Sequence, residues 1–328
     1  MQAKNLFLFI LFSSSLFSNY KFETVLSDLD DAWSLDFLNE ETIIFTEMPG
    51  KLKIASLSDG VITDIKNVPK VLYSSQGGLS EVILDPNFSS NRTLYLSYSA
   101  KNTDGKATLF LMSAKLNNDV LEDNKVIFEA KAPRRVPVHI AAKIAFLKDG
   151  TILLASGDGF DHREKAQTLD NHFGKIIRIN KDGTIPADNP FVNVSGALPD
   201  IYSYGHRNMQ GLIVTQSGEI YEHEHGPRGG DEMNLIEPSL NYGWPAITYG
   251  IDYSGAVISP FTEKNGMEQP LLHWTPSIAP SDMIFYDGNI YPKLKNSFLV
   301  TALVSQDVKK VTFAADGKDI QESLFSEL

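Results

Sequence analysis

The chain is patterned as many short apolar runs between turn residues, and no helical period is sustained after residue 20. Val, Ile, Phe, Tyr and Leu fill these runs, and Gly, Asp, Asn and Pro separate them, which is typical of strands joined by tight turns. The clearest runs are Ser34 to Phe37, Thr42 to Thr46, Lys51 to Ala55, Leu94 to Tyr98, Thr108 to Lys115, Lys143 to Phe146, Thr151 to Ser156 and Lys175 to Ile179. Many short strands predict a sandwich, a barrel or a propeller.

Recurring hairpin signals narrow this choice. Asp-Gly or Ser-Gly pairs stand between β-forming residues at 149–150, 182–183, 217–218 and 316–317. Such pairs accept the positive φ angles of tight hairpin turns. Hairpins repeated tens of residues apart are what stacked propeller blades produce, because each blade is a small antiparallel sheet. No low-complexity linker divides the chain, so we expect one propeller domain over residues 20–328.

The N-terminus has the layout of a secretory leader. One Lys precedes an apolar run from Leu6 to Phe12, and small polar residues follow it. The run is too short to cross a bilayer as a stable helix. We expect a signal peptide over residues 1–19 and therefore a periplasmic or secreted protein without stable membrane insertion. A short membrane anchor and a buried N-terminal strand are the alternatives.

Composition removes several classes of function. The chain has 29 Lys and Arg against 41 Asp and Glu, a formal net charge of −12, which disfavours nucleic acid as a partner. It has no cysteine, which excludes thiol catalysis and thiolate metal sites. No GxSxG, Walker A or GxGxxG motif is present, so hydrolase and nucleotide-binding functions lack support. A small, neutral or cationic partner fits better.

Most chemically capable residues lie between residues 200 and 245. Arg207 and Asn208 follow a predicted strand, where a planar guanidinium and an amide can bind carboxylate or quinone oxygens. A solvated surface turn is the alternative for this pair. Outside this stretch, His139 lies at the entrance of the strand Lys143 to Phe146, where a base can face a cleft. A structural histidine is the alternative there.

The segment from residue 222 to 232, EHEHGPRGGDE, resembles a metal site at first sight. However, the i, i+2 spacing places His223 and His225 on one face of a strand and Glu224 on the other, which disfavours catalytic zinc. The glycine-rich turn instead offers backbone carbonyls beside Asp231 and Glu232, and hard oxygen donors suit calcium. A connecting loop with solvated acidic residues is the alternative.

Several long segments, in this order, closely resemble one family. They are QGGLSEVILDPNFSSNRTLYLSYS, AQTLDNHFGKIIRINKDGTIPADNPF, IYSYGHRNMQGL, EHEHGPRGGDEMNLIEPSLNYGWP and HWTPSIAPSDM, and the match covers roughly residues 30 to 310. The family is that of the soluble glucose/sorbosone dehydrogenases, and the segments are most similar to its periplasmic aldose sugar dehydrogenases, which use pyrroloquinoline quinone (PQQ). The resemblance implies an all-β, six-bladed β-propeller of four-stranded antiparallel blades, with the quinone near its axis.

The resemblance also implies an enzyme that oxidises an aldose at C1 by hydride transfer to PQQ. By this similarity His139 is the general base that takes the proton of the anomeric hydroxyl. Gln76, Arg207 and Asn208 are expected to hold the cofactor. Electrons are expected to pass to an acceptor of the respiratory chain, and the protein is expected to be a monomer or a dimer.

Two calcium sites follow from the same resemblance. The backbone carbonyls of Gly226 and Pro227 are expected to ligate the Ca2+ ion that polarises the cofactor. Glu232 and the carbonyl of Tyr242 match a second, structural calcium. A cation beside an ortho-quinone favours its reduction, so the first ion has a direct chemical use.

Two departures from the family pattern matter. Where relatives have a Gly-Gly-Arg or similar run after the base, this chain has Ile140, Ala141 and Ala142, and added methyl groups are expected to narrow the pocket. Relatives also continue past this point with an Arg-containing segment and a closing strand, so we expect an incomplete last blade. A cofactor-less propeller that acts as a carbohydrate-binding or interaction module is therefore the alternative function, and an incomplete reading frame is a third interpretation.

Overall fold

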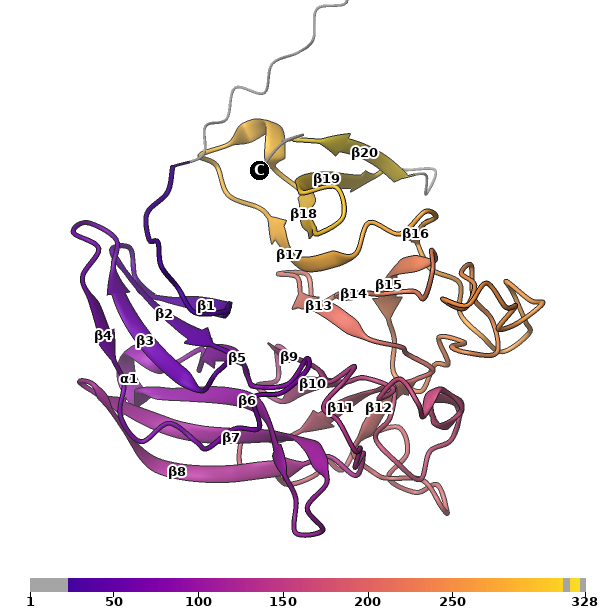
Figure 1. The fold of residues 1–328 in the computed structure, drawn as a ribbon, viewed down its shortest axis with the longest axis horizontal. Helices are drawn as coiled ribbons and strands as arrows, with labels where there is room; N and C mark the ends of the chain where they lie inside the picture. Colours follow the sequence, from indigo (N-terminus) through magenta and orange to yellow (C-terminus); the bar gives the residue numbers. More distant parts are fainter. Residues whose placement is uncertain (1–22, 315–318, 325–328) are drawn as a thin grey trace, which may run out of the picture.

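The computed structural model describes residues 23–314 and 319–324, and it is an all-β propeller of five four-stranded antiparallel sheets. The sheets follow one another around an arc, as Figure 1 shows. The expected signal peptide lies outside the described residues. Within the part of the chain that is described, no helix is long and apolar enough to cross a membrane.

Each blade takes four strands that succeed one another in sequence. Blade one contains β1 (Ala32–Asn39), β2 (Thr42–Glu47), β3 (Lys51–Ser56) and β4 (Ile62–Asp64), and blade two contains β5 (Leu79–Leu84), β6 (Thr93–Lys101), β7 (Ala107–Asn117) and β8 (Val120–Glu129). Blade three contains β9 (Ala141–Phe146), β10 (Ile152–Ser156), β11 (Lys175–Ile179) and β12 (Ile201–Tyr204). Blade four contains β13 (Met209–Val214), β14 (Ile220–Glu224), β15 (Asp231–Ile236) and β16 (Leu272–Trp274), and blade five contains β17 (Pro280–Tyr286), β18 (Ser297–Ala302), β19 (Asp307–Phe313) and β20 (Asp319–Ser323).

Within residues 23–314 and 319–324, three short helical turns interrupt this pattern. They are the α-helix α1 (Phe88–Asn91) and the 3-10 turns η1 (Arg163–Gln167) and η2 (Pro292–Leu294). The scarcity of helix agrees with the absence of a helical period in the sequence. The all-β prediction is thus confirmed over the described residues.

The predicted number of six blades is wrong, because the described chain supplies twenty strands and each sheet uses four of them. The prediction of an incomplete last blade is wrong as well. Blade five has all four strands, and β20 pairs along its whole length with β19. The six-blade count came from the resemblance, and sequence pattern alone does not number blades because the hairpin signals are irregularly spaced.

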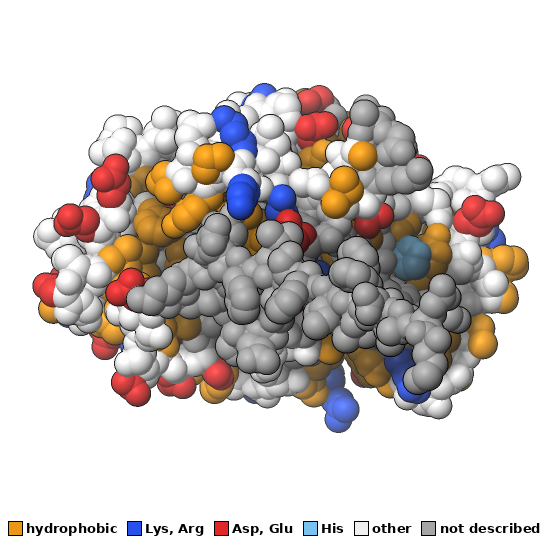
Figure 2. Space-filling view, turned by 90° about the horizontal axis from the view of Figure 1, so that it is seen from above, with side chains coloured by type: hydrophobic (Ala, Val, Ile, Leu, Met, Phe, Trp, Pro, Cys, Tyr) orange, Lys and Arg blue, Asp and Glu red, His pale blue; other side chains and the backbone are white. Residues whose placement is uncertain are grey.

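The arc of five blades leaves apolar side chains exposed on the innermost strands of blades one and five. On β1, Trp33, Leu35 and Phe37 are 38%, 54% and 57% exposed, and Ile284 on β17 is 55% exposed. On the face shown in Figure 2, both acidic and basic side chains appear among the described residues.

Two of the three hairpins whose turns are described form as predicted. Asp149 and Gly150 lie in the turn between β9 and β10, and Ser217 and Gly218 lie between β13 and β14. The pair at 182–183 forms a turn after β11, but the next strand begins only at Ile201. Turn chemistry therefore predicts the reversal of the chain but not which segment pairs after it.

The hydrophobic core is divided into clusters between successive blades. One cluster joins Leu109 and Leu111 of blade two to Ile152 and Leu154 of blade three, and similar clusters lie between blades one and two, three and four, and four and five. Burying each such side chain contributes about 1.5–3 kcal/mol. Blades three and four are thus held firmly face to face, and they carry the site described next.

We predict that Leu154→Ala lowers the free energy of unfolding by about 2–5 kcal/mol, because the side chain is fully buried between blades two and three. Ile284→Ala is the matched control, because this exposed position should change stability by at most about 0.5 kcal/mol. Urea unfolding followed by tryptophan fluorescence measures both. Equal destabilisation by the two substitutions would contradict the assignment of the core.

Candidate active site

A cleft of about 360 Å³ opens at one end of blades three and four. Its walls include His139 before β9, Asp158 after β10, Arg207 after β12, and Trp244 and Tyr253 from the long segment between β15 and β16. Loops at strand ends are free to carry chemistry because the packed blades hold them in place. The size is that of a small-molecule pocket.

A larger hollow of about 710 Å³ is lined by turns of blades two, three and four. Its lining contains no histidine, and its one carboxylate, Asp149, is paired with Arg178 at 2.6 Å. It therefore offers no free base. The smaller cleft around His139 is the better candidate on chemical grounds.

His139 and Asp158 form a buried hydrogen-bonded pair. Nδ1 of His139 lies 2.7 Å from Oδ1 of Asp158, and the two residues are 6% and 1% exposed. Burial lowers the pKa of His139 and the Asp158 carboxylate raises it, and with the nearby charges of Arg207 and Arg134 the pKa lies below its ordinary value. Burial raises the pKa of Asp158, but hydrogen bonds from His139 and from the backbone of Phe160, together with the charge of Arg207, leave the pKa of the carboxyl below its ordinary value. At neutral pH the pair is thus a neutral imidazole on an ionised carboxylate.

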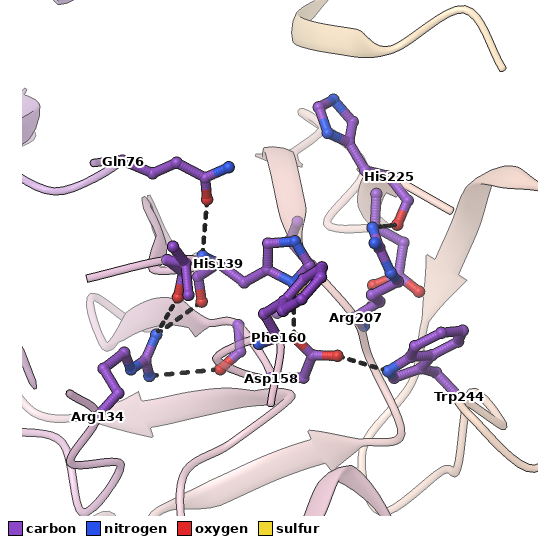
Figure 3. A network of polar contacts seen from close by, with 12 residues as sticks. Gln76, Arg134, His139, Asp158, Phe160, Arg207, His225 and Trp244 are labelled. Atoms are coloured by element: carbon purple, nitrogen blue, oxygen red, sulfur yellow. Dashed lines mark hydrogen bonds and ion pairs between the residues drawn. The ribbon is translucent and has the colours of Figure 1, made fainter. Parts of the chain in front are cut away.

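Asp158 accepts two further hydrogen bonds. Its Oδ1 accepts from the backbone N–H of Phe160 at 2.8 Å, and its Oδ2 accepts from Nε1 of Trp244 at 2.7 Å. The Phe160 ring lies edge-on to His139 at 5.2 Å, as Figure 3 shows from close by. With Nδ1–H committed to the carboxylate, Nε2 of His139 is left as the acceptor at the cleft. This is the arrangement that a general base requires.

The backbone around His139 is held in an unfavourable conformation. His139, Ala141 and Ala142 have φ angles of 44°, 61° and 77°, in the left-handed region that costs L-residues about 1–2 kcal/mol each. The buried guanidinium of Arg134 stabilises this turn, since its Nη1 donates to the carbonyl of His139 at 2.7 Å. Opposite this turn, a Cβ on Gly157 would meet the same carbonyl at 2.2 Å. Glycine is therefore required there.

The methyl groups of Ala141 and Ala142 do not point into the cleft, although the sequence led us to expect this. Their methyl groups belong to the hydrophobic clusters on either side of blade three, and neither residue lines the cleft. The expected narrowing of the pocket by these two side chains is not seen. Lys143, next in sequence, is also turned away from the cleft and pairs with Glu81 at 2.9 Å.

Gln76 and Arg207 face the His139 region from different blades. Oε1 of Gln76 accepts from the backbone N–H of His139 at 2.7 Å, and Figure 3 shows its amide nitrogen pointing away from that bond. Nη1 of Arg207 donates to the carbonyl of His225 at 2.8 Å, and its guanidinium lies 5.3 Å from the ring of Trp244. Asn208 is buried beside Arg207, and its Oδ1 has no hydrogen-bond partner.

The four residues expected to ligate the two calcium ions are spread over several cavities of blade four. Pro227 lines the cleft, whereas Gly226 and Glu232 line a separate small cavity next to it. Tyr242 lines neither cavity; its ring stacks on His206 at 4.7 Å and its hydroxyl donates to the carbonyl of Leu235. Gly226 and Pro227 both line a further hollow of about 780 Å³. Both calcium sites stay predictions.

Sequence reasoning missed Asp158 and the role of Trp244. Asp158 lies in Gly157-Asp158-Gly159, directly after a strand that the sequence predicts correctly. An acidic residue at the end of a strand is the sequence feature that could have identified it as a site residue. Trp244 reads from sequence as core packing in an aromatic turn. Its contact with Asp158 spans 86 residues, which no local pattern predicts.

The family model described as Glucose / Sorbosone dehydrogenase matches residues 29–328. The chain belongs to this family. Aldose sugar dehydrogenase YliI of Escherichia coli is 35% identical over 92% of this chain and 82% of its own length. Quinoprotein glucose dehydrogenase B of Acinetobacter calcoaceticus is 29% identical over 74% of this chain and 56% of its own. The resemblance stated from the sequence motifs is thus confirmed.

Solved structures agree with this glucose/sorbosone dehydrogenase assignment. The soluble aldose sugar dehydrogenase of E. coli, crystallised in its apo-form, matches with a TM-score of 0.88 and 34% identity. The match covers 92% of this chain and 88% of that chain. The described blades therefore share their arrangement with a sugar dehydrogenase of the same family.

We predict that Asp158→Asn moves the pKa of His139 still further below its ordinary value of 6.5, because removal of the carboxylate removes the charge that raises it. Nitrogen NMR of histidine-labelled protein across a pH titration measures this shift without any ligand. Asp161→Asn is the control, since Asp161 lines the same cleft but is exposed and does not contact the imidazole. A higher or unchanged pKa for His139 in the Asp158 variant contradicts the pairing.

Proposed function

We propose that this protein is a quinone-dependent aldose dehydrogenase that oxidises the sugar at C1. The observation that carries the proposal is the His139 and Asp158 pair at the cleft, since a neutral imidazole held by a buried carboxylate is suited to accept a hydroxyl proton. Membership of the glucose/sorbosone dehydrogenase family supports the substrate class. The name of the Acinetobacter relative, a quinoprotein, supports the cofactor.

The residues around the cleft fit a quinone that carries carboxylates. Arg207 supplies positive charge to its lining, whereas Arg163 is paired with Glu164 and Asp252 at 3.4 Å. The amide oxygen of Gln76 is engaged by His139, and its amide nitrogen can donate to a cofactor oxygen. The orphaned Oδ1 of buried Asn208 is a polar atom that needs a partner. The carbonyls of Gly226 and Pro227 offer the hard oxygen donors that calcium prefers. Gln76, Arg207 and Asn208 are therefore the proposed cofactor-binding residues.

When bound, PQQ supplies a two-electron acceptor for the hydride that leaves C1 of the sugar. His139 accepts the proton of the anomeric hydroxyl at Nε2, so that C1 loses a hydride and the oxygen loses a proton, and a lactone forms. Asp158 stabilises the resulting imidazolium and keeps Nδ1 protonated throughout. Trp244 and Phe160 shield the pair from water, which strengthens the electrostatic interaction between them.

Several further features belong to the same proposal. Glu232 and the carbonyl of Tyr242 are proposed to hold a structural calcium, and electrons are proposed to pass to a respiratory acceptor. Residues 1–19 are proposed to direct export, which places the enzyme in the periplasm or outside the cell. A cofactor-less carbohydrate-binding module would have no use for the ordered imidazole and carboxylate pair, so we favour the enzyme.

We predict that the purified chain loaded with PQQ and Ca2+ oxidises aldoses, and that His139→Gln lowers kcat/KM by about 10²–10⁴-fold, the usual contribution of a general base. His162→Gln is the matched control, because His162 lies nearby, packs on Phe173 and does not line the cleft. Turnover is followed with an artificial electron acceptor, and PQQ affinity is measured separately by fluorescence.

The lower kcat/KM of the His139 variant shows a catalytic role only if the variant still binds PQQ as tightly as the unaltered chain. Unchanged turnover in His139→Gln would exclude His139 as the base. Sugar binding without measurable PQQ binding in the unaltered chain would instead establish the carbohydrate-binding module and overturn the enzyme.

A further inference from the structure

A second group of chemically capable side chains lies beneath the cleft, buried on one face of blade four. Glu222 and Glu224 are two apart on β14 and therefore point to the same face. His206, from the turn between β12 and β13, lies against them. The proposed reaction uses none of these three side chains.

The three side chains converge on one point. Nδ1 of His206 lies 3.8 Å from Oε1 of Glu222 and 3.8 Å from Oε2 of Glu224, and one ligand atom from each residue falls within 4.8 Å of the others. His206 and Glu222 are fully buried, and Glu224 is 3% exposed. At 3.8 Å no hydrogen bond is formed, so Nδ1 of His206 and Oε2 of Glu222 have no partner. Such orphaned atoms are rare in a protein interior.

Each of the three side chains is oriented by an outer contact. Nε2 of His206 lies 2.9 Å from Oγ of Ser203, so the other ring nitrogen is directed at the carboxylates. Nδ2 of Asn234 donates to Oε1 of Glu222 at 2.7 Å, and the backbone N–H of Arg207 donates to Oε2 of Glu224 at 2.7 Å. Protein metal sites use outer contacts of this kind to fix ligand geometry.

The carboxylates of Glu222 and Glu224 carry negative charge that no neighbouring basic side chain offsets. Within the described part of the chain, neither Glu222 nor Glu224 forms an ion pair with a lysine or an arginine. Lys175, the buried lysine near His206, donates instead to the backbone carbonyls of residues 165, 166 and 173. Burying an uncompensated carboxylate costs several kcal/mol. A bound cation or a captured proton must therefore offset the charge.

We propose that His206, Glu222 and Glu224 bind one divalent transition-metal ion, for which zinc is the reference probe. Imidazole nitrogen with two carboxylates suits Zn2+ better than Ca2+ or Mg2+, which prefer oxygen ligands alone. The observed 3.8 Å separations are close to the distance of about 3.4 Å between ligands of a tetrahedral zinc ion. The two distances to His206 need a contraction of a few tenths of an ångström to reach this geometry, and all three donors already lie within 4.8 Å of one another.

The site has a structural consequence for the cleft above it. Glu224 holds the backbone N–H of Arg207, and Arg207 in turn donates to the carbonyl of His225. An ion bound to Glu224 fixes the turn that carries Arg207 into the cleft wall. The proposed site contains a nitrogen donor, unlike the calcium site proposed at Glu232 and Tyr242. The two sites are neighbours, because Glu224 lies opposite Glu232 in the strand pair and His206 stacks on Tyr242.

The test uses the purified chain freed of metal with a chelator and then titrated with Zn2+ in a large excess of Ca2+. We expect one zinc per chain by calorimetry and elemental analysis, with a rise in Tm. Glu222→Gln, which keeps the shape of the side chain, should weaken zinc binding at least tenfold and abolish the rise in Tm. Glu219→Gln is the matched control, since Glu219 directly precedes the same strand but is exposed, and it should bind zinc like the unaltered chain.

A spectroscopic measurement on the unaltered chain tests the proposal even if a variant fails to fold. Co2+ should give a visible absorption band typical of tetrahedral nitrogen and oxygen ligation, and one equivalent of Zn2+ should remove it. The proposal is overturned if the chain takes up no zinc or cobalt beside calcium. It is equally overturned if Glu222→Gln binds zinc as tightly as Glu219→Gln, because the metal would then be held at surface groups.

Discussion

The buried carboxylate of Asp158 is the interaction on which the candidate site depends. It accepts hydrogen bonds from His139, from the backbone of Phe160 and from Trp244, and it is only 1% exposed. A charge so deeply buried is tolerated only where several donors satisfy it. The same three bonds select the tautomer of His139 and fix its ring. They also place Trp244 beside the guanidinium of Arg207.

The blades supply the rigidity that this arrangement needs. Their apolar faces pack in clusters between successive sheets, so the loops at the strand ends start from fixed positions. Strain is concentrated at the turn after His139, where three residues adopt positive φ. Arg134 offsets part of that strain through hydrogen bonds to backbone carbonyls at 2.7 and 3.0 Å. A base held in this way needs little reorganisation to receive a proton.

Blade four contributes polar groups on both of its faces, which is unusual for a strand so fully buried. Glu222 and Glu224 face blade three together with Asn234, whereas His223 points to the opposite side and has no hydrogen-bond partner. The alternation in EHEH places His223 and Glu224 on opposite faces of β14, so these neighbours cannot share one metal ion. The ligand group found in space instead combines the two glutamates with His206, sixteen residues before Glu222 in the chain.

Much of the fold was predictable, because strand and turn chemistry is local. Alternating β-forming residues and Gly-containing turns gave the strands of blade three and the hairpins at Gly150 and Gly218. The number of blades was not predictable in this way. Blades are counted by which strands pair, and the strand that follows the turn at Gly183 begins only eighteen residues later, at Ile201. The exposed apolar face of β1 likewise follows from the arrangement of the blades rather than from the strand itself.

The sequence by itself determined the all-β class, the family and the candidacy of His139, Gln76, Arg207 and Asn208, because these depend on local patterns and on motifs that are contiguous in the chain. Only the tertiary structure decided which groups meet. Asp158 reaches Trp244 across 86 residues, and His206 meets Glu222 and Glu224 across a strand boundary. Such contacts are set by how two sheets pack face to face. A linear pattern contains no signal for them, since burial and distance, and with them the pKa of each group, arise only when the blades assemble.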